Sequence, residues 1–310
     1  VYAAIAGLTL LAMAEKKQRE RFSTGLRARK GLGVALGALA VVVLLFGAWL
    51  LQRPDGRLHV AFLDVGQGDA TLITSPDGRQ VLIDGGRYPS ALLDELGEQM
   101  PFWDRSIDLL IATHPDDDHV AGLVEVAERY DVGQLVTNGA TADGNAAYAT
   151  LLAAVNADAI HGAQPGETIN LGDGALLEII QAGRTGLSDN DGSVVARLVY
   201  GELTVLLTGD AGEAAEAAMA RDGRPLAAVV LKAGHHGAKT SSSDTFLRAV
   251  APQFVVISAG AGNSYGHPAP EMLARAAAIG ATVLRTDEMG TIEVSSDGER
   301  MWWATEVPDQ

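Results

Sequence analysis

Apolar residues follow one another without interruption near the start of the chain. Residues 32–51 are twenty residues without a charge, which is the length of a helix that crosses the hydrocarbon core of a membrane. We therefore predict a transmembrane helix over residues 32–52, with a buried core helix as the alternative interpretation. Residues 1–14 are also apolar but too short to span. We interpret them as the end of an earlier transmembrane helix, and a cleaved signal peptide is the rival interpretation.

Beyond Gly56 the pattern changes to short β-branched runs that alternate with helical stretches. The β-branched runs predict strands over residues 58–64, 70–74, 80–83, 109–112, 134–136, 177–180, 194–200, 204–207, 228–231, 254–257, 282–285 and 291–294. The helical stretches are residues 90–99, 120–129, 146–155, 212–221, 244–250 and 270–279. Such alternation is typical of a soluble α/β domain.

Twelve predicted strands are too many for one doubly wound sheet. The turns at residues 76–78 and 201–202 indicate antiparallel hairpins. We therefore predict one α/β domain over residues 55–305 with a four-layer αββα sandwich, in which two mixed sheets pack together and helices cover their outer faces. The tryptophans outside the predicted span are expected to close its core; they are Trp103, Trp302 and Trp303.

Charge is distributed unevenly along the chain. The sequence holds 23 Lys and Arg against 39 Asp and Glu, but residues 15–30 contain seven basic and two acidic residues, which leaves a balance of −21 elsewhere. Under the positive-inside rule we expect residues 15–31 to form a cytoplasmic loop between two spans, which places the domain on the extracytoplasmic side. An acidic body repels polyanions, so a nucleic-acid substrate needs bound metal or local cations. The sequence has no cysteine, which excludes thiolate metal sites.

The densest group of ionisable side chains follows a predicted buried strand. His114-Pro115-Asp116-Asp117-Asp118-His119 places two imidazoles and three carboxylates within six residues. Ionised carboxylates at this spacing repel one another, and a divalent cation would relieve the repulsion. The alternative is a solvated acidic loop in which Asp118 caps the next helix. Because a helix cap needs no histidines, the segment predicts a metal site.

This segment resembles the His-x-His-x-Asp-His motif of the metallo-β-lactamase superfamily, with Asp116 where the second histidine usually stands. Three further segments resemble superfamily landmarks in the same order: residues 81–86 (VLIDGG), 205–210 (VLLTGD) and 231–237 (LKAGHHG). The resemblance covers roughly residues 57–296. It implies a metallo-β-lactamase-like sandwich and hydrolysis at a dinuclear metal site.

The chain is more specifically similar to the C-terminal domain of ComEC-type DNA-uptake competence proteins. This similarity lies in residues 62–70 (FLDVGQGDA), 235–241 (HHGAKTS) and 265–268 (YGHP), and in the aspartate at position 116. In that family the domain follows a polytopic membrane channel. The resemblance therefore implies a phosphodiesterase or nuclease at the cell membrane, with DNA as substrate and the channel portion of the full-length protein as partner.

The superfamily pattern also implies a set of metal ligands. They are His114 and Asp116 on one ion, Asp118 and His119 on the other, Asp210 as the bridge, and one of His235 and His236 to complete a site. The middle histidine that the pattern expects before residue 194 is absent, and Asp189, Asn190 and Asp191 stand in that region. We interpret residues 64–69 as a tight strand–strand connection whose carboxylates face the metal pocket or brace its loops.

The donor set favours particular chemistry. A carboxylate in place of imidazole shifts the preference toward Mn²⁺, with Zn²⁺ or Mg²⁺ possible. Two divalent ions about 3.5–4 Å apart would activate a shared water for in-line displacement. Asp118 is predicted to orient this water, and His267, Lys239 or the spare histidine of the 235–236 pair to stabilise the leaving group. Two other functions fit: a hydrolase of another ester, such as a lactone or cell-envelope phosphodiester, and a non-catalytic module docked on the membrane channel.

Overall fold

The computed structural model describes residues 13–18, 36–47, 54–183 and 188–307. The chain divides into two compact units, Val1–Arg53 and Pro54–Gln310. In the first unit residues 13–18 and 36–47 are helical. Within the described part of the chain, no helix has both the length and the apolarity that a membrane crossing requires. The rest of the two predicted spans, and most of the predicted basic loop, lies outside the described residues.

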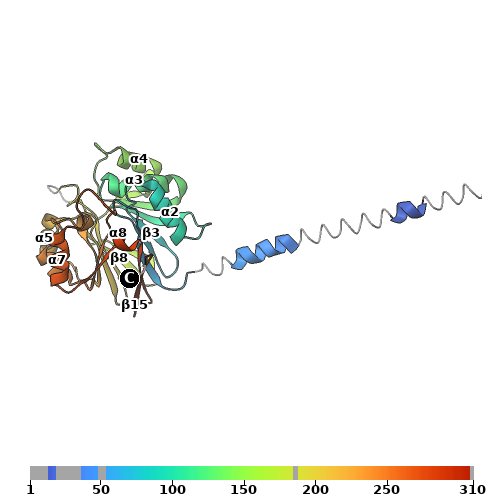
Figure 1. The fold of residues 1–310 in the computed structure, drawn as a ribbon. Helices are drawn as coiled ribbons and strands as arrows, with labels where there is room; N and C mark the ends of the chain where they lie inside the picture. The colour runs from blue at the N-terminus through green and yellow to red at the C-terminus, as the bar shows by residue number, and fades with distance from the viewer. Residues whose placement is uncertain (1–12, 19–35, 48–53, 184–187, 308–310) are drawn as a thin grey trace, which may run out of the picture. The chain divides into compact units, whose positions relative to one another are not determined.

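Two β-sheets form the second unit (Figure 1). The eight-stranded sheet has the order β15-β14-β1-β2-β3-β4-β5-β6 and the seven-stranded sheet the order β13-β12-β11-β10-β9-β8-β7. The strands of the first are β1 (Leu58–Phe62), β2 (Thr71–Thr74), β3 (Gln80–Ile83), β4 (Ser106–Ala112), β5 (Asp131–Thr137), β6 (Ile160–Gly162), β14 (Ile292–Ser296) and β15 (Met301–Thr305). Those of the second are β7 (Thr168–Gly172), β8 (Ala175–Gln181), β9 (Val195–Tyr200), β10 (Leu203–Leu207), β11 (Val230–Lys232), β12 (Phe254–Ile257) and β13 (Thr282–Arg285).

Both faces of each sheet are buried, as β10 illustrates. Leu203, Val205 and Leu207 lie on the face that packs in the core shared by the two sheets. Leu206 points to the opposite face and packs in a separate apolar cluster beneath helices. Successive side chains of a strand alternate between faces, so a continuous apolar run such as this one indicates a strand that is covered on both sides.

Helices cover the two outer faces (Figure 1). The helices over the eight-stranded sheet are α2 (Pro89–Gln99), α3 (Asp117–Arg129) and α4 (Ala146–Ala154). Those over the seven-stranded sheet are α5 (Glu213–Asp222), α6 (Asp244–Val250) and α7 (Pro270–Ala278), and the short α8 (Thr286–Met289) follows β13. The mixed α/β sandwich predicted from the sequence is therefore confirmed.

The strands that the sequence did not predict are β6, β7 and β15, and all three lie at sheet edges. An edge strand is covered less completely, so its sequence lacks the apolar pattern of a central strand. The expectation that three tryptophans close the core is wrong. Trp302 and Trp303 lie on β15 and are 37% and 39% exposed, and Trp103 is 40% exposed. The Arg57 guanidinium lies over the Trp302 ring at 4.2 Å.

The direction of the strands determines where polar side chains gather. β3, β4 and β5 run parallel to one another, as do β10, β11 and β12. β1 is antiparallel to β2, which is antiparallel to β3, so β1 runs in the same direction as β3. The loops that follow β1, β3, β4, β10 and β11 therefore leave the sandwich at common edges, where ligand sites of α/β proteins form.

Candidate metal site

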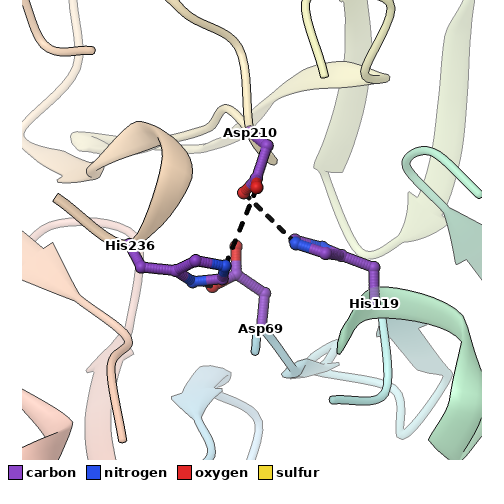
Figure 2. A group of neighbouring side chains, drawn as sticks. All are labelled: Asp69, His119, Asp210 and His236. Atoms are coloured by element: carbon purple, nitrogen blue, oxygen red, sulfur yellow. Dashed lines mark hydrogen bonds and ion pairs between the residues drawn. The ribbon is translucent and has the colours of Figure 1, made fainter. Parts of the chain in front are cut away.

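Four buried side chains from distant parts of the sequence meet at this edge (Figure 2). They are Asp69 in the loop after β1, His119 in the first turn of α3, Asp210 after β10, and His236 in a 3₁₀ turn, η2 (Gly234–Gly237), after β11. One potential ligand atom from each lies within 4.8 Å of the others. This is a candidate metal site.

Asp210 lies at the centre of the group. The Nε2 atom of His119 is 3.2 Å from its Oδ1, and the Nε2 atoms of His235 and His236 are each 3.7 Å from its Oδ2. The Nε2 atom of His114 is 4.0 Å from the same oxygen. Burial alone would raise the pKa of Asp210, but the charges of His119 and His236 hold it well below its usual range. Asp210 is therefore an ionised carboxylate surrounded by imidazoles.

Several inward-facing atoms have no hydrogen-bond partner among the described residues. They are the Nε2 atoms of His114, His119 and His236 and the Oδ1 atom of Asp210, all buried. The His119 and Asp210 atoms are close in distance but are not aligned as a hydrogen bond. A buried polar atom without a partner costs about 1–3 kcal/mol. Three nitrogens and one carboxylate oxygen converging on one pocket fit a divalent cation, which would satisfy them together.

The outward nitrogen of each of these histidines is held by the protein. The Nδ1 atom of His119 lies 2.8 Å from Asp84 Oδ2, and that of His236 lies 3.0 Å from Asp69 Oδ1. The Nδ1 atom of His114 lies 3.1 Å from the Thr113 hydroxyl. Metal-binding histidines commonly donate their second N–H to such partners, which fixes the direction of the ligating nitrogen. The rings are thus oriented with Nε2 toward the pocket.

Asp84 comes from the predicted landmark at residues 81–86. It adopts a positive φ of 59° directly after β3. Its carboxylate accepts hydrogen bonds from the Thr113 backbone N–H at 2.8 Å and from the Thr113 hydroxyl at 2.7 Å, in addition to its contact with His119. These contacts join the ends of the neighbouring strands β3 and β4 and orient His119.

Asp69 has a similar role on the other side of the pocket. Its Oδ1 faces His236, and its Oδ2 accepts a hydrogen bond from the buried ammonium of Lys232. Lys232 and His236 hold the pKa of Asp69 below its usual value, although burial alone would raise it. Because both carboxylate oxygens are engaged, we assign Asp69 to positioning His236 rather than to the inner ligand group with which it clusters by distance.

The loop at residues 64–69 braces the histidine segment, as one of the two sequence interpretations held. Gly68 has φ of 112°, and a Cβ atom there would lie 1.9 Å from the Asp118 carbonyl oxygen. The Asp69 backbone N–H donates to that oxygen at 3.3 Å. The Gln67 side-chain amide donates to Asp118 Oδ2 at 3.2 Å. Only glycine at position 68 permits this close approach.

Asp116 and Asp118 lie at opposite sides of the pocket. Asp116 Oδ2 is 3.6 Å from His114 Nε2, whereas Asp118 Oδ2 is 3.5 Å from His236 Nε2. Burial alone would raise the pKa of Asp118, but its hydrogen bond with His236 and the charge of His119 place it far below the usual value. The alternative in which Asp118 caps the helix is wrong, since α3 begins at Asp117 after Asp116 as N-cap.

The two adjacent histidines have different surroundings. His236 is 3% exposed, and His235 is 35% exposed. Both have positive φ, 49° for His235 and 53° for His236, in the turn that follows β11. Burial lowers the pKa of His236, but the nearby Asp210 and Asp69 outweigh it and raise the value to about 10. In the metal-free protein this imidazole is therefore protonated.

His267 lies on the exposed side of the histidine pair. Its ring centroid is 5.7 Å from that of His235 and 6.4 Å from that of His236. Burial and the positive charges of His236 and His235 lower the pKa of His267. A neutral imidazole at the pocket rim can accept a proton and can donate a hydrogen bond near neutral pH.

The structure does not bring Lys239 to the pocket. Its side chain is 69% exposed and its ammonium lies 3.9 Å from Glu271. Of the three residues considered for the missing middle histidine, Asn190 reaches the site, because its amide donates to Asp210 Oδ2 at 3.5 Å. Asp191 instead accepts a hydrogen bond from the Gly212 backbone at 3.0 Å, and Asp189 shows no side-chain contact with the pocket.

Sequence reasoning placed the carboxylates of residues 64–69 at the pocket or its loops and Asp84 in a landmark, but it did not identify Lys232 or the histidines that Asp69 and Asp84 orient. The available signals were a lysine at the end of the apolar run of β11 and an aspartate in a loop between two buried strands. Buried opposite charges in one domain are expected to pair. Asp69 and Lys232 are 163 residues apart in the sequence, however, so no local pattern indicates that they pair.

Comparison with known proteins also indicates a metallo-hydrolase fold. Residues 63–260 match the sequence profile of the Metallo-beta-lactamase superfamily. The chain belongs to this superfamily. The resemblance inferred from the histidine segment is thereby confirmed.

The relatives include competence proteins. Competence protein ComA of Neisseria gonorrhoeae is 31% identical over 265 residues, which cover 83% of this chain and 36% of that protein. ComE operon protein 3 of Bacillus subtilis is 30% identical over 284 residues, which cover 86% of this chain and 36% of that protein. The resemblance to ComEC-type competence proteins is confirmed, and the chain spans about a third of the length of these relatives.

A solved structure shows a similar fold at low sequence identity. A mutant of the CmlA beta-hydroxylase superposes with a TM-score of 0.50 at 15% identity, over 74% of this chain and 52% of that chain. This similarity concerns the fold alone.

Proposed function

We propose that this chain is a metal-dependent phosphodiesterase that hydrolyses DNA at the pocket around Asp210. The observation that carries the proposal is the convergence of three buried Nε2 atoms and one carboxylate oxygen without protein partners. Buried polar atoms without hydrogen-bond partners destabilise the metal-free protein, and a bound metal ion would satisfy them. The competence-protein relatives support DNA as the substrate class.

The contacts support two overlapping ligand groups that share Asp210. His114 and Asp116 form one group, since their facing atoms are 3.6 Å apart. Asp118 and His236 form the other, with facing atoms 3.5 Å apart. His119 lies between them, with its ring 4.1 Å from that of His114 and 5.3 Å from that of His236. We favour His236 over His235 as the ligand because it is buried and its Nδ1 is held by Asp69.

The donor set supports Mn²⁺ over Zn²⁺. Three aspartates contribute hard oxygen donors, and the missing middle histidine removes a nitrogen donor that would favour zinc. Asn190 is the residue nearest to that position, and its amide oxygen would add another hard donor after a flip of the amide. Mg²⁺ and Zn²⁺ are the alternatives.

Two divalent ions bound here would make a shared water acidic and neutralise charge on the attacking and leaving oxygens. The protein supplies orientation and hydrogen bonds. Gln67 fixes Asp118 by a hydrogen bond to Oδ2, which leaves Oδ1 to accept a hydrogen bond from the attacking water and so orient it. His235 and His267 lie on the exposed side of the pocket, where a neutral imidazole can donate a hydrogen bond to the departing oxygen. No side-chain nucleophile is needed.

The membrane setting also belongs to the proposal. The uncharged run over residues 32–51 supports attachment to the cell membrane, and residues 36–47 of that run are helical with exposed leucine and valine side chains. The coverage of about a third of the competence-protein relatives supports a larger full-length protein with a channel portion as partner. Protease protection in spheroplasts would test the extracytoplasmic position: digestion of residues 54–307 from the outside is expected, and full protection would contradict it.

The enzymatic proposal is tested with the 310-residue chain purified in detergent. We expect cleavage of DNA and of bis-p-nitrophenyl phosphate with Mn²⁺, and loss of both activities in Asp210→Ala and His119→Ala. Asp94→Asn, an exposed carboxylate on α2, is the matched control. Activity that persists in the Asp210→Ala/His119→Ala double variant would refute the site. Cleavage of the small diester without DNA would favour the hydrolase of another ester, which the acidic body of the protein also suits.

A further inference from the structure

A groove of about 660 Å³ opens beside the candidate metal site. Three segments form its two walls: the loop after β1 together with Arg87 and Tyr88 on one side, and residues 260–265 after β12 on the other. One residue of the groove wall also contacts the metal site. Gln67 lines the groove and also donates a hydrogen bond to Asp118. The groove therefore adjoins the metal pocket through Gln67.

The groove contains a cation that the protein does not neutralise. The Arg87 guanidinium makes no hydrogen bond or ion pair with the described residues, whereas the Arg87 backbone N–H donates to the Gln67 carbonyl at 3.0 Å. A guanidinium presents paired N–H donors that match the oxygens of a phosphate.

Two aromatic rings are exposed on the same groove. Tyr88 is 52% exposed and Tyr265 is 57% exposed. The Tyr265 ring is stacked on the His267 imidazole, with centroids 6.1 Å apart and planes 11° apart. Flat rings with one free face are platforms for nucleobases.

Both rings are held on rigid backbone. Tyr88 is the N-cap residue of α2 and is followed by Pro89. On the opposite wall, the Asn263 amide oxygen accepts hydrogen bonds from the Tyr265 and His267 backbone N–H groups, each at 3.1 Å. The Asn263 amide nitrogen donates to the His267 carbonyl at 2.6 Å. Preorganised rings lose little entropy when a ligand stacks on them.

We propose that this groove binds the unpaired nucleotides next to the scissile bond, with bases stacked on Tyr265 and Tyr88 and a phosphate paired with Arg87. The inference deepens the proposed phosphodiesterase function and depends on it. A base in a duplex already has both faces covered by its neighbours, so exposed rings favour a single strand. The groove thus gives an acidic protein a local means of holding a polyanion, and it selects single-stranded over double-stranded nucleic acid.

The test measures binding without catalysis. Fluorescence anisotropy of a labelled oligothymidylate is recorded with the full chain in EDTA, and again with its duplex with oligoadenylate. We expect tighter binding of the single strand. Tyr265→Ala and Tyr88→Ala should each raise Kd roughly 5- to 150-fold, which is the range that one base–aromatic stack contributes. Tyr265→Phe, which keeps the ring, should bind as the wild type does.

Matched controls separate stacking and charge from general damage. Phe102→Ala removes an exposed ring elsewhere on the surface, 63% exposed, and should leave Kd unchanged. Arg87→Gln should lower the slope of log Kd against log salt by about one, whereas Arg79→Gln, whose charge already faces Asp77, should change it less. Equal affinity for single strand and duplex, or wild-type binding by both tyrosine-to-alanine variants, would overturn the proposal.

Failure of this inference is distinguishable from failure of the proposed function. Cleavage of bis-p-nitrophenyl phosphate by the wild-type chain with Mn²⁺ reports on the metal pocket alone. Diester cleavage with no single-strand preference would retain the phosphodiesterase and reject the groove. Single-strand binding that depends on Tyr265 without any diester cleavage would support the groove as a nucleic-acid site and reject the hydrolytic function.

Discussion

The pairing of Asp69 with Lys232 and His236 gives the sharpest prediction about how the site is built. Asp69→Asn keeps the size of the side chain but removes its charge. The Lys232 side chain is 2% exposed, so its ammonium would be left buried without a counter-charge. Breaking a buried ion pair at one partner costs roughly 3–5 kcal/mol. We expect urea denaturation to show a loss of this size in the free energy of unfolding.

The same substitution affects metal binding for a separate reason. The asparagine amide is a weaker partner for His236 Nδ1 than a carboxylate. The His236 ring is therefore oriented less firmly, and its Nε2 atom is less basic. Loss of such an outer partner typically lowers metal affinity 10- to 100-fold. Titration calorimetry with Mn²⁺ measures this directly. Asp94→Asn, on the exposed face of α2, controls for the loss of one negative charge.

A double-mutant cycle with Lys232→Met separates the two effects. The double variant Asp69→Asn/Lys232→Met has neither buried charge, so it should be more stable than the sum of the single losses by roughly 0.5–3 kcal/mol. Its metal affinity should stay low, because His236 still lacks its carboxylate partner. Additive stability losses, or a metal affinity restored together with stability, would refute the assignment of Asp69 to both partners.

Three further predictions follow from individual contacts. Gly68→Ala should lower the unfolding free energy by roughly 2–4 kcal/mol, because the new Cβ would lie 1.9 Å from the Asp118 carbonyl oxygen. Gly144 also has a positive φ but has open space around it, so Gly144→Ala should lower the unfolding free energy less. Equal losses in the two variants would contradict the reasoning. His59→Gln should lose about 0.5–1 kcal/mol of unfolding free energy near pH 6 and little near pH 9, because the hydrogen bond that His59 donates to Glu293 raises the pKa of His59. The contribution of His59 is complete below the unfolded pKa of about 6.5 and disappears as pH rises through the folded pKa; a loss independent of pH would exclude this. Lys239→Ala should leave the rate of diester cleavage within about twofold of the wild type, since Lys239 faces Glu271 and solvent. A tenfold loss in kcat would show that Lys239 takes part in catalysis.

The central parts of the fold were predictable because their residues carry local signals. Buried strands such as β10 are apolar on both faces, and the predicted helices at residues 244–250 and 90–99 agree with α6 and α2 within one residue. The strands at the sheet edges were missed because they are short or half-exposed. The aromatic residues of β15 misled the core assignment, since the Trp302 ring lies against the Arg57 guanidinium at the surface and the Trp303 ring is 39% exposed.

The sequence allowed us to predict the candidate metal ligands, but not the residues that orient them. The histidine segment, Asp210 and the histidine pair are readable because ligand-type residues follow buried strands directly. Sequence could not choose between His235 and His236, because burial and the partner on Nδ1 decide it, and both depend on tertiary contacts. The pairing of Asp69 with Lys232 spans 163 residues, and no local spacing encodes it.

The most direct test is the metal content of the protein. The chain is dialysed against Mn²⁺ and then against metal-free buffer, and bound metal is counted by inductively coupled plasma mass spectrometry for the wild type and for Asp210→Asn. Two Mn²⁺ per wild-type chain and fewer than one in the variant are expected, because Asp210 faces all four imidazoles of the pocket. A wild-type chain that retains no Mn²⁺, Zn²⁺ or Mg²⁺, or an Asp210→Asn variant that retains as much metal as the wild type, would contradict a metal site at this pocket.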